Sequence, residues 1–181
     1  MQTNLTKKRR SPSKSVALVG IMAATMECGK LVLSFLPNVE IVTLLCALFG
    51  YVFGYLGVAS ALVFVCIEPL IYGFGTWIAS YFLYWPFVAG AFWLLARMRV
   101  KNRWLITALA VMLTIWFGVL SSLVEIGLFS GFFDSFLERF SVYYLRGIPF
   151  YAVQVATNAA VFPMLFTFAA KKLTRVRDNF F

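Results

Sequence analysis

The sequence contains no histidine, the residue on which most hydrolytic and many metal-dependent sites rely. Without it the chain has no Ser-His-Asp triad and no zinc site of the usual histidine-ligated kinds. Its three cysteines, Cys28, Cys46 and Cys66, fall inside apolar segments, and their odd number and spacing indicate neither a disulfide framework nor a metal motif. We therefore expect the cysteines to be small buried apolar side chains, and we expect no catalytic site.

Acidic residues and phosphate-binding loops are also scarce. Asp and Glu together number 7, and they are scattered along the chain. A metal-dependent lipid enzyme would show paired acids at regular spacing. No Gly-rich phosphate-binding loop is present, so this chain cannot power transport with ATP by itself. No internal repeat is visible, which argues against an inverted-repeat transporter contained in one chain.

Apolar residues dominate what is present. Of 181 residues, 62% are hydrophobic and 13% are charged, whereas soluble proteins average about 45–50% and about 25%. A soluble domain of this size has too little interior to hide so much apolar surface. The 20 Phe, 8 Tyr and 5 Trp suit contact with lipid and with the membrane interfaces. The composition therefore predicts an all-α integral membrane protein.

The formal charge of +9 could suggest binding to nucleic acid, but the positions of the charges argue against it. Most Lys and Arg fall in three clusters beside apolar segments, within residues 7–14, 97–103 and 171–177. This is the pattern of the positive-inside rule. We expect contact with anionic lipid headgroups and no nucleic-acid partner.

The spanning length of about 20 residues divides the chain into six helices. We expect a disordered basic cytoplasmic arm at 1–14, a six-helix membrane domain at 15–172 and a cytoplasmic tail at 173–181. The expected helices lie at about 15–35, 39–55, 57–72, 77–96, 104–128 and 143–170. The second and third are short enough to count together as one irregular hairpin. An even number of crossings places all three basic clusters, and so both termini, on the cytoplasmic side.

Two segments allow another interpretation. The first apolar run could be a signal peptide, but Glu27 and Lys30 follow it in place of a cleavage site, so we expect a retained helix. The stretch 129–142 alternates aromatic and polar residues. It reads as an amphipathic cap along the outer membrane interface.

Ionisable residues inside apolar segments need explaining, because each costs about 2.5–3.5 kcal/mol to insert. They are Glu27, Lys30, Glu40, Glu68, Glu125 and Arg146. Counting residues along each helix places four of them in the outer third of the membrane, with Glu27 and Glu68 nearer the midplane. The expected partner of Glu68 is Lys30 or Arg146. Alternatively, Glu27 and Lys30, three residues apart on one helix face, neutralise each other.

Aromatic and amide residues gather at the same outer level. Rings that stack and a few hydrogen-bonding groups that fix orientation are what a site for a flat organic solute requires. The alternative is an ordinary interfacial belt of Trp and Tyr. The candidate solute-binding residues are Asn38, Glu40, Glu68, Tyr72, Trp77, Tyr81, Trp85, Arg146, Gln154 and Asn158.

The first helix carries small residues one turn apart. Ala17, Gly20 and Ala24 form a small-xxx-small pattern, which lets another helix approach closely. The pattern predicts either packing within the chain or docking to a separate membrane partner.

With these features the chain, over about residues 15–172, resembles the substrate-binding S components of energy-coupling factor (ECF) vitamin transporters. The resemblance rests on size, six helices, the basic arm, the small-residue face, the run Phe35-Leu-Pro-Asn-Val-Glu40 and the run Glu68-Pro-Leu-Ile-Tyr-Gly-Phe-Gly75-Thr-Trp77. Gly20 replaces one member of the family's usual alanine pair and keeps its small size.

The resemblance implies capture of a vitamin from outside by a multi-pass protein of a prokaryotic plasma membrane. It implies docking through Ala17, Gly20 and Ala24 onto a membrane scaffold (T) protein and two ATPase subunits, which hydrolyse the ATP, and no cofactor in this chain. The cobalamin-type S components are the most similar. The alternatives are a self-contained secondary carrier, a small membrane enzyme or a purely structural membrane subunit.

Overall fold

The computed structural model describes residues 11–180, and its regular structure in that range is helical. α5 continues into a π-helical turn, and a second π-helical turn joins α6 to α7. The elements are α1 (Pro12–Val32), α2 (Val42–Phe53), α3 (Tyr55–Tyr72), α4 (Trp77–Arg97), α5 (Arg103–Leu123) with π turn Val124–Phe129, α6 (Phe136–Val161), π turn Phe162–Phe166, and α7 (Thr167–Phe180).

Within residues 11–180, five helices are long and apolar enough to cross a membrane. They are Pro12–Val32, Tyr55–Tyr72, Trp77–Arg97, Arg103–Phe129 and Phe136–Asn179. α2 has only 12 residues, about 18 Å at 1.5 Å per residue, against a hydrocarbon core of about 30 Å. The all-helical membrane fold is therefore confirmed. The expected second helix at 39–55 is shorter than predicted at both ends. It begins only at Val42, and it ends at Phe53 because Gly54 takes a positive φ of 65°.

α2 is the core of the fold. All of its residues except Leu45 and Tyr51 are buried. The longer helices pack around it, with α4 and α3 making its most extensive contacts. A helix that is apolar on every side must be enclosed by other elements, which explains how so short an apolar helix sits among longer ones.

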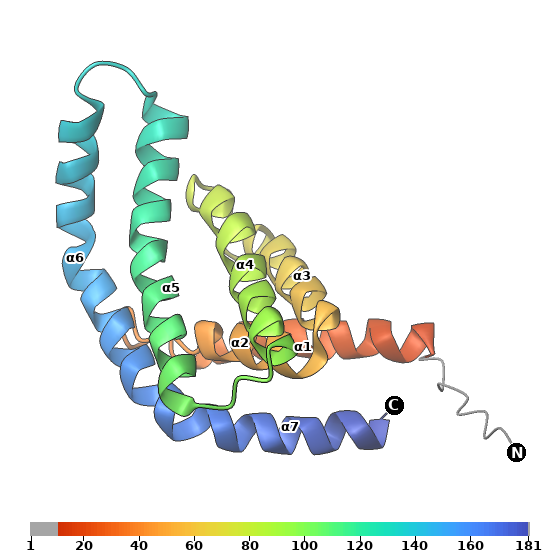
Figure 1. Ribbon diagram of the computed structural model, residues 1–181. Helices are drawn as coiled ribbons and strands as arrows, with labels where there is room; N and C mark the ends of the chain where they lie inside the picture. Colours follow the sequence, from red (N-terminus) through yellow and green to blue (C-terminus); the bar gives the residue numbers. More distant parts are fainter. Residues whose placement is uncertain (1–10, 181) are drawn as a thin grey trace, which may run out of the picture.

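The helices spread like a fan (Figure 1). α1, α2 and α7 cross the lower part of the view, α3 and α4 run obliquely, and α5 and α6 stand upright. Successive helices from α1 to α6 run in opposite directions, and α7 continues from the end of α6. The α1–α2, α3–α4 and α5–α6 turns therefore lie along one side, and the α2–α3 and α4–α5 turns lie along the other with the start of α1 and the end of α7.

Several predicted boundaries are corrected by the structure. Helix α1 begins at Pro12, because proline at the first helical position is already set for the helix. Residues 12–14 are thus helical, and the first ten residues of the predicted disordered arm lie outside the described residues. The predicted tail at 173–181 continues α7 as far as Phe180.

The segment 129–142, predicted as an interfacial cap, contains the start of helix α6. The helix starts at Phe136 instead of at 143, so half of the segment forms its first two turns. The turn that remains is held by Arg139, whose Nη1 and Nη2 donate to the carbonyls of Ser130 and Gly131, each at 2.9 Å. Only Cys46 of the three cysteines is buried, whereas Cys28 and Cys66 are exposed on the apolar surface.

We predict that Gly50→Ala destabilises the fold, because α2 and α4 approach each other too closely for any side chain there. A Cβ on Gly50 would lie 2.0 Å from the backbone carbonyl oxygen of Ala89. The helices would have to separate, at an expected cost of about 3 kcal/mol in the free energy of unfolding. Reversible unfolding in detergent micelles measures this quantity.

The matched control is Gly20→Ala, where the added Cβ meets nothing within 4 Å. Alanine there should be neutral or stabilise by up to about 1 kcal/mol through helix propensity. Equal stability of the two variants would contradict the close α2–α4 contact.

Candidate binding site

A fully buried carboxylate marks the centre of the site. Glu68, on α3, has no exposed side-chain surface and forms an ion pair with Lys30 Nζ from the last turn of α1. A buried charge is tolerated inside apolar surroundings only when it is paired and hydrogen-bonded. Of the two expected partners, Lys30 is therefore the one that the structure pairs with Glu68. Arg146 is exposed and lies in a separate groove beside the α5–α6 turn.

Aromatic rings surround the Lys30 ammonium. Its Nζ lies 3.9 Å from the ring centre of Tyr72, 5.6 Å from that of Tyr81 and 5.9 Å from that of Trp77. The Tyr72 hydroxyl donates a hydrogen bond to Glu27 Oε1 at 2.9 Å. Glu27 and Lys30 therefore do not neutralise each other as one interpretation expected. Glu27 contacts Tyr72, and Lys30 contacts Glu68, so both residues of α1 are paired with α3.

A second polar cluster joins the start of α2 to α5 and α6. The two oxygens of Glu40 accept from Thr43, one from the backbone N–H at 2.8 Å and one from the hydroxyl at 2.5 Å. Asn158 Nδ2 donates to Glu40 Oε1 at 3.1 Å and to Thr114 Oγ1 at 3.0 Å. Glu40 therefore caps the first turn of α2, where a negative charge is favoured, and it ties α2 to α6.

Between the two clusters lies a cavity of about 70 Å³. Helices α1 to α6 and the α1–α2 turn each contribute residues to its walls. The lining residues are Lys30, Glu40, Val42, Thr43, Phe64, Tyr81, Tyr84, Trp85, Phe117 and Gln154.

Four of the lining residues form an aromatic wall. Tyr81, Tyr84 and Trp85 lie on one face of α4, because residues three and four apart share a side of a helix. Phe117 of α5 completes the wall, with its ring centre 4.7 Å from Tyr84 and 6.3 Å from Trp85, the latter in a stacked arrangement. The wall offers flat apolar surfaces against which a ring system can stack.

Four buried polar atoms in the two clusters and the cavity wall have no hydrogen-bond partner within the described residues. They are Glu27 Oε2, Glu68 Oε1, Trp85 Nε1 and Asn158 Oδ1. Leaving such a group unpaired costs about 1–3 kcal/mol. Only Trp85 of these residues lines the cavity, so its indole N–H is the donor that a bound molecule can reach, and the three oxygens lie behind the wall.

The ten residues predicted from sequence fall into three groups. Glu40, Tyr81, Trp85 and Gln154 line the cavity. Glu68, Tyr72, Trp77 and Asn158 lie behind its walls and contact lining residues or their partners. Asn38 lies in the α1–α2 turn with a positive φ of 62°, and neither it nor Arg146 lines the cavity.

Several lining residues were absent from the candidate set. Lys30 is ionisable and Tyr84 is amphipathic, and this character is the signal by which sequence reasoning could have included them. Phe64, Phe117 and Val42 carry no such signal, because an apolar residue in an apolar helix reads the same whether it faces lipid or a cavity.

The small-residue face of α1 is not used for packing within the described chain. Ala17, Gly20 and Ala24 are all exposed, and nothing lies within 4 Å of a Cβ placed on Gly20. Of the two expectations for this face, packing against another helix of the same chain is excluded for the described residues.

Comparison with protein-family models, with curated proteins and with solved structures gave no match to this chain. The resemblance to S components therefore stays a prediction from the residues of the chain.

Proposed function

We propose that this chain is the substrate-capture subunit of an ATP-driven importer of the ECF type, and that it binds a small organic solute in the cavity between its helices. The observation that supports this most is the cavity itself, which α1 to α6 line together and in which an aromatic wall, including the unpaired indole nitrogen of Trp85, faces the polar side chains of Lys30, Glu40 and Gln154. Such a site meets the usual requirements for binding a solute, with apolar stacking surfaces and a few polar groups that fix orientation.

The charges around the cavity favour a particular kind of solute. Glu27, Glu40 and Glu68 contribute three carboxylates against the single ammonium of Lys30. The unpaired atoms are mainly acceptors. We expect a flat solute that is rich in N–H or O–H donors and neutral or cationic, because the ionisable groups in and behind the cavity wall include more carboxylates than cations.

The volume favours a compact solute. Sites for small molecules commonly measure roughly 300–1,000 Å³, whereas this cavity encloses about 70 Å³. Binding cobalamin, the ligand of the most similar S components, would require the helices to separate widely. A small vitamin requires much less movement.

We further propose six crossings with both termini in the cytoplasm, and α2 as a short crossing enclosed by its neighbours. The basic clusters at 97–103 and 171–177 lie on the same side of the fold as the start of α1 (Figure 1). Arg97 and Arg103 stack on Trp93 and Trp104, with the guanidinium carbon about 5 Å from each ring centre, as expected at a membrane interface. Lys30, Glu40 and Tyr81 lie near the opposite ends of their helices, so the cavity faces outward.

The energy for uptake would come from partners. The exposed face of Ala17, Gly20 and Ala24 lies in the half of α1 away from the cavity, where close approach by a helix of a scaffold (T) protein would be possible. That protein and two ATPase subunits would couple ATP hydrolysis to release of the solute inside.

A thermal-shift screen of the purified protein against water-soluble vitamins, cobalamin included, tests solute capture. A true ligand at about 100 times its Kd stabilises the folded state by about 2.7 kcal/mol, which corresponds to a rise in Tm of about 5–10 °C for a protein of this size. We expect a neutral or cationic vitamin to give this rise. Transport by the chain alone after reconstitution, without any ATPase, would instead favour a self-contained carrier.

A further inference from the structure

A second pocket lies at the other end of α2, on the side of the basic clusters. It measures about 400 Å³ and is bounded by the end of α2, the α4–α5 turn, the start of α5 and the face of α7. Its lining residues are Tyr51, Lys101, Ile106, Phe166, Thr167, Ala170, Lys171, Thr174 and Arg175. None of the residues that form the solute cavity takes part in it.

The pocket has a cationic rim. Lys101 approaches from the α4–α5 turn, and Lys171 and Arg175 approach from α7 one turn apart, so three positive charges face one space. Among the described residues that line it, none is acidic. A pocket with three cations and no lining carboxylate has the electrostatics of an anion site.

The floor of the pocket is apolar. Ile106, Phe166 and Ala170 are buried, and the ring of Tyr51 packs edge-on against Phe166 with ring centres 5.4 Å apart. The Tyr51 hydroxyl donates to the carbonyl of Val100 at 2.8 Å, which fixes the α4–α5 turn beside Lys101. The pocket therefore joins a polar rim to an apolar interior, as an amphiphilic ligand requires.

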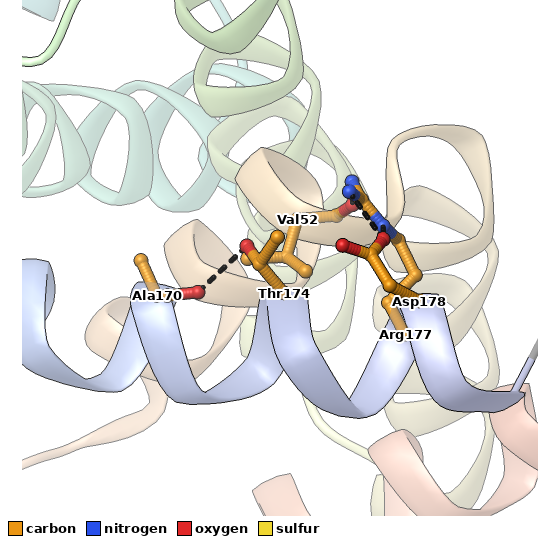
Figure 2. Close-up of polar contacts among 5 residues, drawn as sticks. All are labelled: Val52, Ala170, Thr174, Arg177 and Asp178. Carbon is orange, nitrogen blue, oxygen red and sulfur yellow. Dashed lines mark hydrogen bonds and ion pairs between the residues drawn. The ribbon is translucent and has the colours of Figure 1, made fainter.

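Helix α7 is held in place to form this pocket (Figure 2). Arg177 Nη1 donates to the carbonyl of Val52 at 3.0 Å, which satisfies a carbonyl in the last turn of α2. Asp178 accepts from two nitrogens of the same guanidinium, at 2.8 and 3.0 Å. Thr174 Oγ1 bonds to the carbonyl of Ala170 at 2.8 Å on the same helix. The cationic face of α7 is thus fixed toward α2 and α5.

We propose that this pocket binds the headgroup of an anionic phospholipid. The phosphate would lie between Lys101, Lys171 and Arg175, and the first part of an acyl chain would lie on Phe166 and Ile106. Basic pockets beside spanning helices on the cytoplasmic side are suited to anionic headgroups. A free phosphate shares the charge but would leave the apolar floor unused, which favours the lipid.

Native mass spectrometry of the full chain, released from nanodiscs of mixed phosphatidylglycerol and phosphatidylcholine, tests this site. We expect one retained phosphatidylglycerol and no comparable retention of phosphatidylcholine. Lys171→Gln with Arg175→Gln should lower the affinity for phosphatidylglycerol by roughly thirtyfold, since each of the two cations contributes about 1 kcal/mol.

The matched control is Lys172→Gln. Lys172 neighbours Lys171 in sequence and carries the same charge, but its Nζ lies over the ring of Phe168 at 4.5 Å, and it does not line the pocket. The control should retain the lipid as the unchanged protein does. An equal loss in the control, unchanged retention in the double variant, or displacement of the lipid by inorganic phosphate at equal concentration would each overturn the lipid site. Circular dichroism of both variants checks that the helices are intact.

Discussion

Lys30→Met is expected to lower the free energy of unfolding by about 3–4 kcal/mol and to abolish solute binding. The substitution keeps an unbranched side chain of similar length but leaves Glu68, which is fully buried, without its cation. Removing one partner of a buried ion pair is costly because the remaining charge stays desolvated and unpaired. Reversible unfolding in micelles measures the first effect, and the thermal-shift assay measures the second.

Two controls separate the ion pair from a general effect of the substitution. Lys172→Met removes an exposed cation far from the site and should change stability by no more than about 0.5 kcal/mol. The double variant Lys30→Met, Glu68→Leu replaces the pair with apolar side chains and should recover most of the stability, yet it should still fail to bind solute. If Lys30→Met were as stable as the unchanged protein, the buried pair could not be organising the site.

Gly20→Trp is expected to abolish uptake in the assembled transporter while leaving solute binding unchanged. Gly20 is exposed, and a side chain there meets nothing within the described chain. Tryptophan should therefore be accommodated by the isolated protein and should block a helix that docks closely against Ala17, Gly20 and Ala24. Uptake in cells that express the whole transporter measures the first effect, and thermal shift of the purified variant measures the second.

The matched control for this variant is Val32→Trp. Val32 is on the same helix and is 67% exposed, but it lies at the opposite end from the small-residue face. The Val32→Trp variant should therefore take up solute at the normal rate. Normal uptake in Gly20→Trp would contradict the proposal that this face docks to a partner. The proposal that the cavity binds solute would be unaffected.

The parts of the fold that sequence reasoning predicted are those that depend on composition. Long apolar runs, basic clusters and glycine turns predict the spanning helices, and most boundaries differ from the structure by only a few residues. The larger errors have local causes. α2 is short because it begins only at Val42 and because Gly54 adopts a positive φ and ends it. α6 is long because the aromatic and polar alternation at 136–142 is also compatible with a helix.

The site was predicted only in part because rotation of a helix about its axis is poorly specified when lipid and protein core are equally apolar. Polar or amphipathic side chains in an apolar helix indicate which side of the helix is turned toward the protein interior. This signal identified Glu40, Tyr81, Trp85 and Gln154. Phe117 gives no such signal. Arg146 lines a different groove from the cavity, because depth in the membrane can be counted along a helix, whereas the direction in which a side chain points cannot.

The most direct test of solute capture is native mass spectrometry of the protein purified from its own membranes, with the bound solute identified by its mass. One small neutral or cationic organic molecule per chain is expected, and Trp85→Phe, which removes the unpaired indole donor and keeps an aromatic ring, should lower its occupancy through an affinity loss of about tenfold. A chain that carries no solute and shows no thermal shift with any vitamin tested would contradict the account.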